Sequence, residues 1–115
     1  MSRAEAVTAA RARDAAPLFA ALGDETRYRL LARLSSDGPG STASLGASSQ
    51  VSRQAITKHL GVLADAGLVR SSRDGRDRIW ELVPARLTQA QQHLDRISQQ
   101  WDDALDRLKK LVEEE

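Results

Sequence analysis

The sequence contains no cysteine, which excludes disulfide bonds, thiolate metal ligands and cysteine redox sensing. Aromatic side chains are scarce, and one Phe, one Tyr and two Trp among 115 residues leave little with which to line a substrate cleft. No apolar run approaches the roughly 18 residues that span a bilayer, and the N-terminus lacks the apolar core of an export signal. We therefore expect a cytoplasmic protein in a reducing compartment.

An excess of charge of one sign is also missing, since 17 Lys and Arg face 16 Asp and Glu. The distribution is uneven, because residues 48–78 carry six basic and three acidic side chains, whereas residues 79–115 carry five basic and eight acidic ones. The middle of the chain is therefore the place to look for an anionic partner. A chain of 115 residues is long enough for one compact domain, without a separate cofactor domain.

The residues needed for catalysis or for a metal centre are few. One of the two histidines, His59, falls in the apolar sector of a helical pattern, where we expect a packed, hydrogen-bonded side chain. The other, His93, has only Asp95 beside it on its own helix, and two ligands do not make a structural metal site. We expect no catalytic residue, no metal site and no cofactor, and hence a binding protein and not an enzyme.

Helical patterns organise the first third of the chain. After an N-terminal arm, residues 1–16, that is frayed or helical, a helix is predicted from Pro17 to Gly23 with Leu18, Phe19 and Leu22 on its apolar side. A second helix opens at Asp24 as N-cap and turns Tyr28, Leu31 and Leu34 inward. It ends at the breaker of residues 35–40, and a short, weak helix is predicted from Thr42 to Ser48.

The segment VSRQAITKHLGVLADAGLV, residues 51–69, specifies both ends of a helix. Ser52 can cap the first free N–H groups, with Val51 and Ile56 placed as a hydrophobic staple. Gly67 suits the left-handed residue that ends a helix, and Leu68 can fold back on Leu63. At about 100° per residue the apolar residues share one side, and the polar ones gather on the other. The polar side consists of Arg53, Gln54, Thr57, Lys58, Gly61 and Asp65.

A β-hairpin is predicted next, with Asp74-Gly75 as its two-residue turn. That turn pairs Arg73 with Arg76 and Val69 with Trp80, and places Val69, Trp80 and Leu82 on the inward face. Three arginines, Arg73, Arg76 and Arg78, then crowd the tip. Opposed arginines repel unless an anion lies between them, which favours an anionic partner; the alternative is a solvated turn partly neutralised by Asp74 and Asp77.

From Pro84 an uninterrupted helical pattern of about 28 residues runs to the acidic end of the chain, and at about 1.5 Å per residue it is about 40 Å long. Apolar residues recur at heptad spacing along it, at Leu87, Leu94, Trp101 and Leu108, with Ala90, Ile97, Ala104 and Leu111 between them. A small domain cannot cover a stripe of this length. We expect part of it to meet another chain, the alternative being a helix folded wholly onto its own domain.

A short helix followed by a turn and a second helix with a polar front is the helix-turn-helix arrangement, in which the second helix enters the major groove of DNA. The positive end of the helix dipole adds attraction for phosphate, and the hairpin forms a wing whose arginines reach an adjacent phosphate or the minor groove. Within the second helix, Arg53 and Gln54 suit base edges, while Ser52, Thr57 and Lys58 suit phosphates.

Four stretches together resemble the ArsR family of winged helix-turn-helix transcriptional repressors: LFAALGDETRYRLLARL, VSRQAITKHLGVLADAGLV, GRDRIWEL and LDRISQQWDDALDRLKKLV. The resemblance implies a single, mostly α domain with a small β-hairpin over residues 17–83, and a long helix over residues 84–115. It also implies a homodimer formed by the first and last helices, bound to an operator with two inverted half-sites. The sequence is similar to the branch without metal ligands, whose inducer is often unknown.

Two sets of site residues follow from the motifs and this resemblance. The expected DNA-binding residues are Ser52, Arg53, Gln54, Thr57, Lys58, Arg73, Arg76 and Arg78. The expected dimer interface consists of Leu18, Phe19, Leu87, Leu94, Ile97, Trp101, Leu105 and Leu108. The chain departs from the family at Gly46 and Ser49, which loosen the short helix, and at Gly61, which removes a basic residue.

Two other functions remain compatible with the sequence. A winged helix can act as a protein–protein adaptor or anti-repressor without binding DNA, and such a protein would show no salt-sensitive affinity for duplexes. Alternatively, a DNA-binding dimer could hold a small apolar ligand between its paired helices. Operator sequence, target genes and inducer are not encoded in any motif of the chain.

Overall fold

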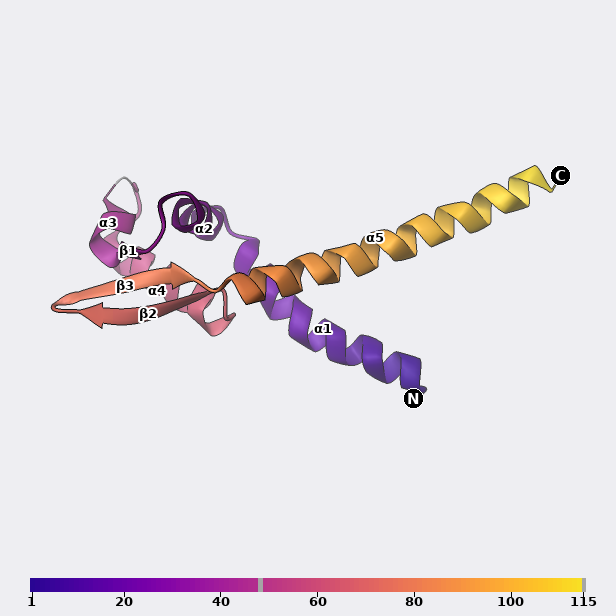
Figure 1. The fold of residues 1–115 in the computed structure, drawn as a ribbon, viewed down its shortest axis with the longest axis horizontal. Coiled ribbons are helices and arrows are strands. Elements are labelled where there is room, and N and C mark those ends of the chain that lie inside the picture. Colours follow the sequence, from indigo (N-terminus) through magenta and orange to yellow (C-terminus); the bar gives the residue numbers. More distant parts are fainter. Residues whose placement is uncertain (48, 115) are drawn as a thin grey trace.

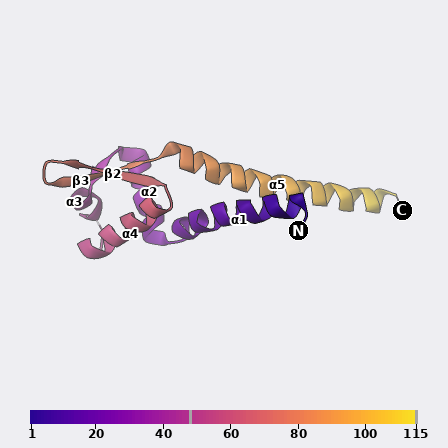
Figure 2. The ribbon, with the colours of Figure 1, turned by 90° about the horizontal axis from the view of Figure 1, so that it is seen from below.

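The computed structural model describes residues 1–47 and 49–114 and consists mostly of helices with one small antiparallel sheet. The elements are α1 (Arg3–Leu22), α2 (Glu25–Asp37), β1 (Gly40–Ser41), α3 (Thr42–Gly46), α4 (Arg53–Asp65), β2 (Val69–Asp74), β3 (Asp77–Leu82) and α5 (Pro84–Glu113). Figure 1 shows a head that contains α2 to β3, from which α1 and α5 leave as two arms; Figure 2 shows both arms on the same side of the head. The expected fold class, a winged helix-turn-helix, is confirmed.

The head is held together by one hydrophobic core to which nearly every element contributes. Its fully buried side chains are Leu18 of α1, Leu68 of the loop after α4, and Ile56, Leu60 and Leu63 of α4. Leu30, Leu31 and Leu34 of α2, Leu45 of α3 and Trp80 of β3 surround them. The second helix therefore differs from its prediction: Leu30 is buried, whereas Tyr28 is 64% exposed. The spacing of three between Tyr28 and Leu31 fits one helix face, but the buried face of α2 consists of Leu30, Leu31 and Leu34.

The first helix begins far earlier than the expected start at Pro17. It runs continuously from Arg3, with Ser2 as N-cap accepting a hydrogen bond from the Glu5 N–H, and it contains Pro17 in its interior. A proline there removes one backbone hydrogen bond of the helix, to the carbonyl of Arg13. The alanine-rich sequence before it has the highest intrinsic helix propensity, so the helix persists through this interruption.

The helix α4 has both of the ends that its sequence predicts. The Ser52 hydroxyl accepts a hydrogen bond from the Ala55 N–H at 3.2 Å. At the other end Gly67 adopts a φ of 80°, and the N–H of Leu68 donates to the Leu63 carbonyl at 3.0 Å, which is the Schellman closure. The preceding short helix α3 is confirmed from Thr42 to Gly46, and its expected end at Ser48 lies outside the described residues.

Two glycines, Gly61 inside α4 and Gly67 just after it, are expected to change the stability in opposite directions when each is replaced by alanine. A Cβ added at Gly61, in the middle of α4, meets no atom within 4 Å, so Gly61→Ala should raise the free energy of unfolding by about 1 kcal/mol through helix propensity. Gly67→Ala should lower it by about 1 kcal/mol because its φ is in the left-handed region. Urea denaturation of both variants measures the two values, and equal signs would contradict this assignment.

The sheet has strand order β1-β3-β2, and its hairpin turns one position later than expected. Asp74 pairs with Asp77 and Val69 with Leu82, so the loop residues are Gly75 and Arg76. Gly75 has a φ of 63°, which suits a turn with glycine in the first loop position. The predicted pairing was therefore wrong by two residues. The inward face is nevertheless as predicted, with Val69 and Trp80 buried and Leu82 half-buried, because a shift of two keeps each side chain on its face.

The strand β1, which adds to the sheet beside β3, was not predicted because it has only two residues. Gly40 pairs with Trp80 and Ser41 with Ile79, and the Trp80 indole N–H donates to the Thr42 hydroxyl at 2.8 Å. These contacts anchor the start of α3 to the wing. A short strand of this kind has no periodic signal in the sequence.

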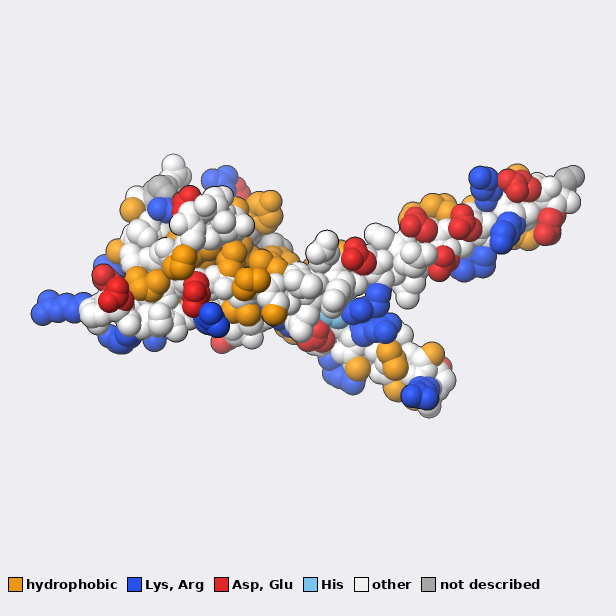
Figure 3. Space-filling view, in the orientation of Figure 1, with side chains coloured by type: hydrophobic (Ala, Val, Ile, Leu, Met, Phe, Trp, Pro, Cys, Tyr) orange, Lys and Arg blue, Asp and Glu red, His pale blue; other side chains and the backbone are white. Residues whose placement is uncertain are grey.

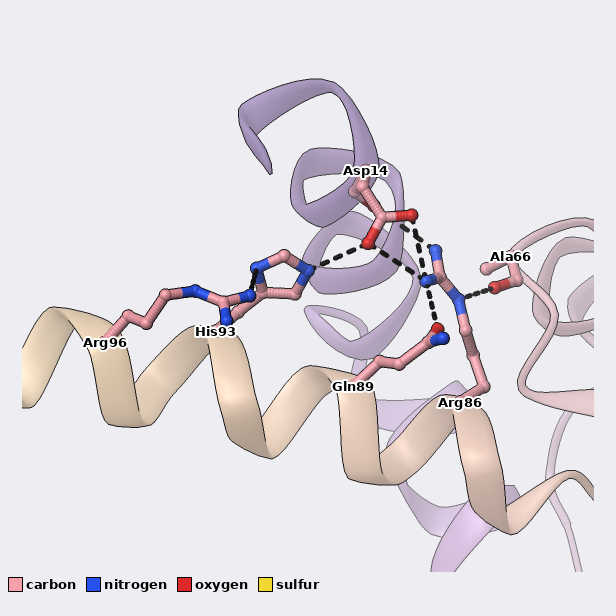
Figure 4. A network of polar contacts seen from close by, with 6 residues as sticks. All are labelled: Asp14, Ala66, Arg86, Gln89, His93 and Arg96. Carbon is pink, nitrogen blue, oxygen red and sulfur yellow. Dashed lines mark hydrogen bonds and ion pairs between the residues drawn. The ribbon is translucent and has the colours of Figure 1, made fainter. Parts of the chain in front are cut away.

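A polar cluster fixes the position of α5 against the head (Figure 4). The Arg86 guanidinium donates to the Asp14 carboxylate of α1 at 3.0 Å and, through Nε, to the Ala66 carbonyl at the end of α4 at 2.9 Å. His93 is buried, and its Nε2 lies 2.8 Å from the same Asp14 carboxylate. The hydrogen bonds from His93 and Arg86 hold the pKa of Asp14 below its ordinary value of 3.8. Arg86 thereby joins three helices that are distant in the sequence.

Candidate nucleic-acid interface

The polar face of α4 is exposed, while its apolar face forms the centre of the core. Ile56, Leu60 and Leu63 have no measurable exposure, whereas Arg53, Gln54, Thr57 and Lys58 are all exposed. The helix packs against α2, α3 and β2. These contacts leave its polar front, which consists of Arg53, Gln54, Thr57 and Lys58, turned away from the head. The division into two faces that the sequence predicts is therefore confirmed.

The first two turns of α4 offer two cations, Arg53 and Lys58, that are unpaired within the described residues. Within the described part of the chain, neither the Arg53 guanidinium nor the Lys58 ammonium forms a hydrogen bond or an ion pair. Since no described carboxylate compensates them, both are available to an anion, and Arg53 lies at the positive end of the helix dipole.

The hydroxyl groups at this end of α4 are not equivalent. Ser52 uses its oxygen as an acceptor for the Ala55 N–H, so its own O–H stays available to donate to a phosphate. Thr57 donates its O–H to the Arg53 carbonyl at 3.0 Å. A phosphate contact by Thr57 as donor therefore requires this internal hydrogen bond to break, a detail that no sequence pattern reports.

The hairpin carries opposed arginines, as expected, but in a different pairing. Arg73 lies directly opposite Arg78, and Arg76 occupies the loop itself. The Arg78 guanidinium lies 5.7 Å from the centre of the Trp80 ring, so a cation–π contact draws it back from the tip along the strand. Figure 3 shows basic side chains projecting from the hairpin end of the head. Arg73 and Arg76 have no acidic partner among the described residues, which leaves them free for an anion.

His59 is placed as the sequence predicts, as a packed and hydrogen-bonded side chain of α4. Its Nδ1 lies 3.1 Å from the Arg27 guanidinium and 3.8 Å from the Asp24 carboxylate. Arg27 also donates to the Ala21 carbonyl at 2.8 Å at the end of α1. Arg27 thus joins α1, α2 and α4, a role that the sequence analysis missed because it depends on three separate elements.

The residues expected at a dimer interface fall into two groups. Leu18 has no exposed surface and belongs to the core of its own protomer, so its assignment to the interface is wrong; Leu87 is partly buried there as well. The others on α5 are 48–67% exposed: Leu94, Ile97, Trp101, Leu105 and Leu108. Phe19 is half-buried and lies edge-on against the ring of His93. An exposed apolar stripe therefore follows α5 beyond the head.

Comparison with known proteins identifies the family. Residues 22–72 match the model of a helix-turn-helix domain. The chain is 36% identical, over 83% of its length and 85% of the relative, to the HTH-type transcriptional regulator Rv2034 of Mycobacterium tuberculosis. It is 39% identical to a solved ArsR-like transcriptional regulator from Rhodococcus sp. RHA1, with a TM-score of 0.76 over 86% of this chain and 92% of that one. The chain belongs to the ArsR family.

A further ArsR-like structure, the transcriptional repressor BigR from Xylella fastidiosa, is 26% identical and has a TM-score of 0.61 over 79% of this chain and 88% of that one. As a member of this family the protein is a DNA-binding transcriptional regulator. Among the described residues no group of three or more His, Asp or Glu side chains could hold a metal ion. No described helix is long and apolar enough to cross a membrane.

Proposed function

We propose that this ArsR-family protein is a homodimeric repressor that binds an operator with two inverted half-sites. Each protomer would insert the front of α4 into the major groove, and the two wings would contact the flanking backbone or minor groove. The observation that carries the proposal is the exposed polar face of α4, whose two cations lack a carboxylate partner among the described residues while Ile56, Leu60 and Leu63 on the opposite face are fully buried. The helix is held rigidly from behind, which favours sequence reading by its exposed side chains.

The exposed stripe of α5 supports a pair of chains. Trp101, Leu105 and Leu108 are large, exposed and aligned along one side of a helix that extends past the head. Apolar side chains in a continuous row are stabilised when a second copy covers them. A twofold axis near the two arms would repeat the cationic fronts on one side of the dimer, about 34–36 Å apart if they occupy successive major grooves.

Within each half-site we assign different roles to the side chains of the front and the wing. Arg53 has the reach and the paired donors for a guanine edge, and Gln54 suits adenine. Ser52 and Lys58 suit phosphates, since both keep a free donor, and Arg76 at the wing tip suits the backbone of the adjacent groove. Thr57 is a secondary contact because its O–H is already donated.

Substitution of two arginines is expected to separate base reading from backbone contact. Arg53→Ala should weaken operator binding by about 1–3 kcal/mol and relax the base preference, because it removes a contact to a base edge. Arg76→Ala should weaken operator and scrambled duplexes alike and flatten the logarithmic salt dependence by about one unit. Fluorescence anisotropy with both duplexes at several salt concentrations measures these effects.

The duplex for that titration comes from selecting fragments of the organism's own DNA on the purified protein, which identifies the site and its adjacent gene together. Glu25→Gln is a suitable control, because this residue is exposed on α2 and its ion pair in the described chain is with the neighbouring Arg29. Equal and salt-independent losses for Arg53→Ala and Arg76→Ala would show that the assigned roles are wrong. An affinity without any salt dependence would favour a protein–protein adaptor.

A further inference from the structure

The structure contains a cleft between α1 and α5 to which the proposed function assigns no role. The cleft has a volume of about 370 Å³, within the range of small-molecule sites and near its lower end. Its wall is mainly apolar, formed on α1 by Ala12, Ala15 and Phe19 and on α5 by Ile97. Five polar residues also line it, Thr8 and Arg11 of α1 and His93, Arg96 and Gln100 of α5.

The two guanidinium groups of the cleft carry positive charge that no carboxylate of the cleft compensates. None of the lining residues is acidic. The Arg11 side chain has no hydrogen-bond or ion-pair partner within the described chain, and Arg96 has only the His93 Nδ1 atom at 3.2 Å. Two uncompensated guanidinium groups above an apolar wall are complementary to a single anionic group attached to an apolar body.

The hydrogen bonds of His93 keep Asp14 engaged away from the two arginines of the cleft. A guanidinium can only donate, so the Nδ1 atom of His93 accepts from Arg96 and its Nε2–H group donates to the Asp14 carboxylate. Asp14 also accepts from Arg86, and within the described chain it forms no ion pair with Arg11 or Arg96.

The cleft and the apolar stripe occupy different sides of α5. At about 100° per residue, the lining residues His93, Arg96 and Gln100 point roughly 110° away from the mean direction of Leu94, Trp101 and Leu108. Ile97 belongs to both sets. Phe19, which lines the cleft from α1, is likewise an expected interface residue, so a second copy packed on the stripe would border the cleft along Ile97 and Phe19.

We infer that this cleft binds a small monocarboxylic acid with an aromatic or aliphatic body. The carboxylate would pair with the guanidinium groups of Arg11 and Arg96, and the body would lie on Phe19, Ile97 and the alanines of α1. Arginine recognises a carboxylate through two parallel hydrogen bonds, which fixes its orientation. The small volume restricts the body to one ring or a short chain.

The test is isothermal titration of the full-length protein with phenylacetate and octanoate, beside the uncharged analogues phenylacetamide and octanamide. We expect saturable binding of at least one acid and no measurable binding of its amide. Arg11→Gln and Arg96→Gln should each weaken that binding about tenfold or more, since each removes a charged hydrogen-bond donor. Ala12→Leu, which fills the cleft, should abolish it, and circular dichroism establishes that each variant is folded.

Arg107→Gln is the matched control, because Arg107 is an exposed arginine of α5 that does not line the cleft. Absence of saturable binding for both acids would overturn the inference, and would mean that the partner chain fills the cleft. Equal binding of acid and amide, or of inorganic phosphate, would overturn it as well. Because these titrations contain no DNA, their outcome is independent of operator binding, and failure of the proposed function would be visible only in the duplex experiments.

Discussion

Trp101→Glu is expected to convert the protein to a monomer at micromolar concentration and to weaken operator binding about 100-fold or more. Trp101 is 67% exposed in the single chain and lies in the middle of the apolar stripe of α5. In a dimer the new carboxylate would be buried without a partner, and burial of an unpaired charge costs several kcal/mol. Once the chains separate, each recognition helix binds its half-site alone and the advantage of two linked contacts is lost.

Sedimentation equilibrium measures the first effect of Trp101→Glu, and anisotropy with the operator duplex measures the second. Gln92→Glu is the control, because it adds the same charge to α5 at an exposed position on the far side of the helix. The core of the single chain does not include Trp101, so the substitution should leave the helical circular dichroism spectrum intact. A dimer that persists in Trp101→Glu would place the interface elsewhere.

Leu60→Ala is expected to lower the free energy of unfolding by about 2–5 kcal/mol. Leu60 has no exposed surface and stands in the centre of the core, on the buried side of α4. Its removal leaves a cavity that neighbouring side chains fill only in part, and the loss is a large fraction of the about 5–15 kcal/mol typical of a domain. Because α4 also presents the DNA-reading side chains, operator affinity near the melting temperature should fall together with stability.

Urea denaturation gives the stability of Leu60→Ala, and Lys58→Ala is the comparison. Lys58 is two residues away on the exposed side of the same helix, so its substitution should change stability by less than about 0.5 kcal/mol while it weakens binding to every duplex. Leu60→Ala is thus expected to lower mainly the stability of the protein, and Lys58→Ala mainly its affinity for DNA. A stability loss below about 1 kcal/mol for Leu60→Ala would contradict the central position of this residue in the core.

The agreement between the sequence and the structure is best where the signals are local. The Ser52 cap, the Gly67 closure and the two faces of α4 depend on residues within one or two turns of each other, and all three are confirmed. The inward face of the hairpin is likewise confirmed because strand alternation has a period of two, although the pairing itself was wrong. The exposed front of α4, which carries the proposed function, is visible in the sequence for the same reason.

The errors and omissions involve contacts between distant parts of the chain. The burial of Leu18 and Leu30, the continuation of α1 through Pro17, and the two-residue strand β1 depend on which neighbours lie opposite. The cluster of Asp14, Arg86 and His93 joins residues up to 79 positions apart. No periodicity specifies such a cluster, because hydrogen bonds between helices depend on the relative positions in which the core holds those helices.

The sequence by itself determined the type, the ends and the two faces of most elements in this protein, since backbone capping and side-chain periodicity act over a few residues. Only the tertiary structure decided which apolar residues remain exposed for a partner, where the hairpin turns, and that two arginines line the same cleft between the first and last helices. Those features depend on packing in three dimensions, which brings together residues that the chain keeps far apart.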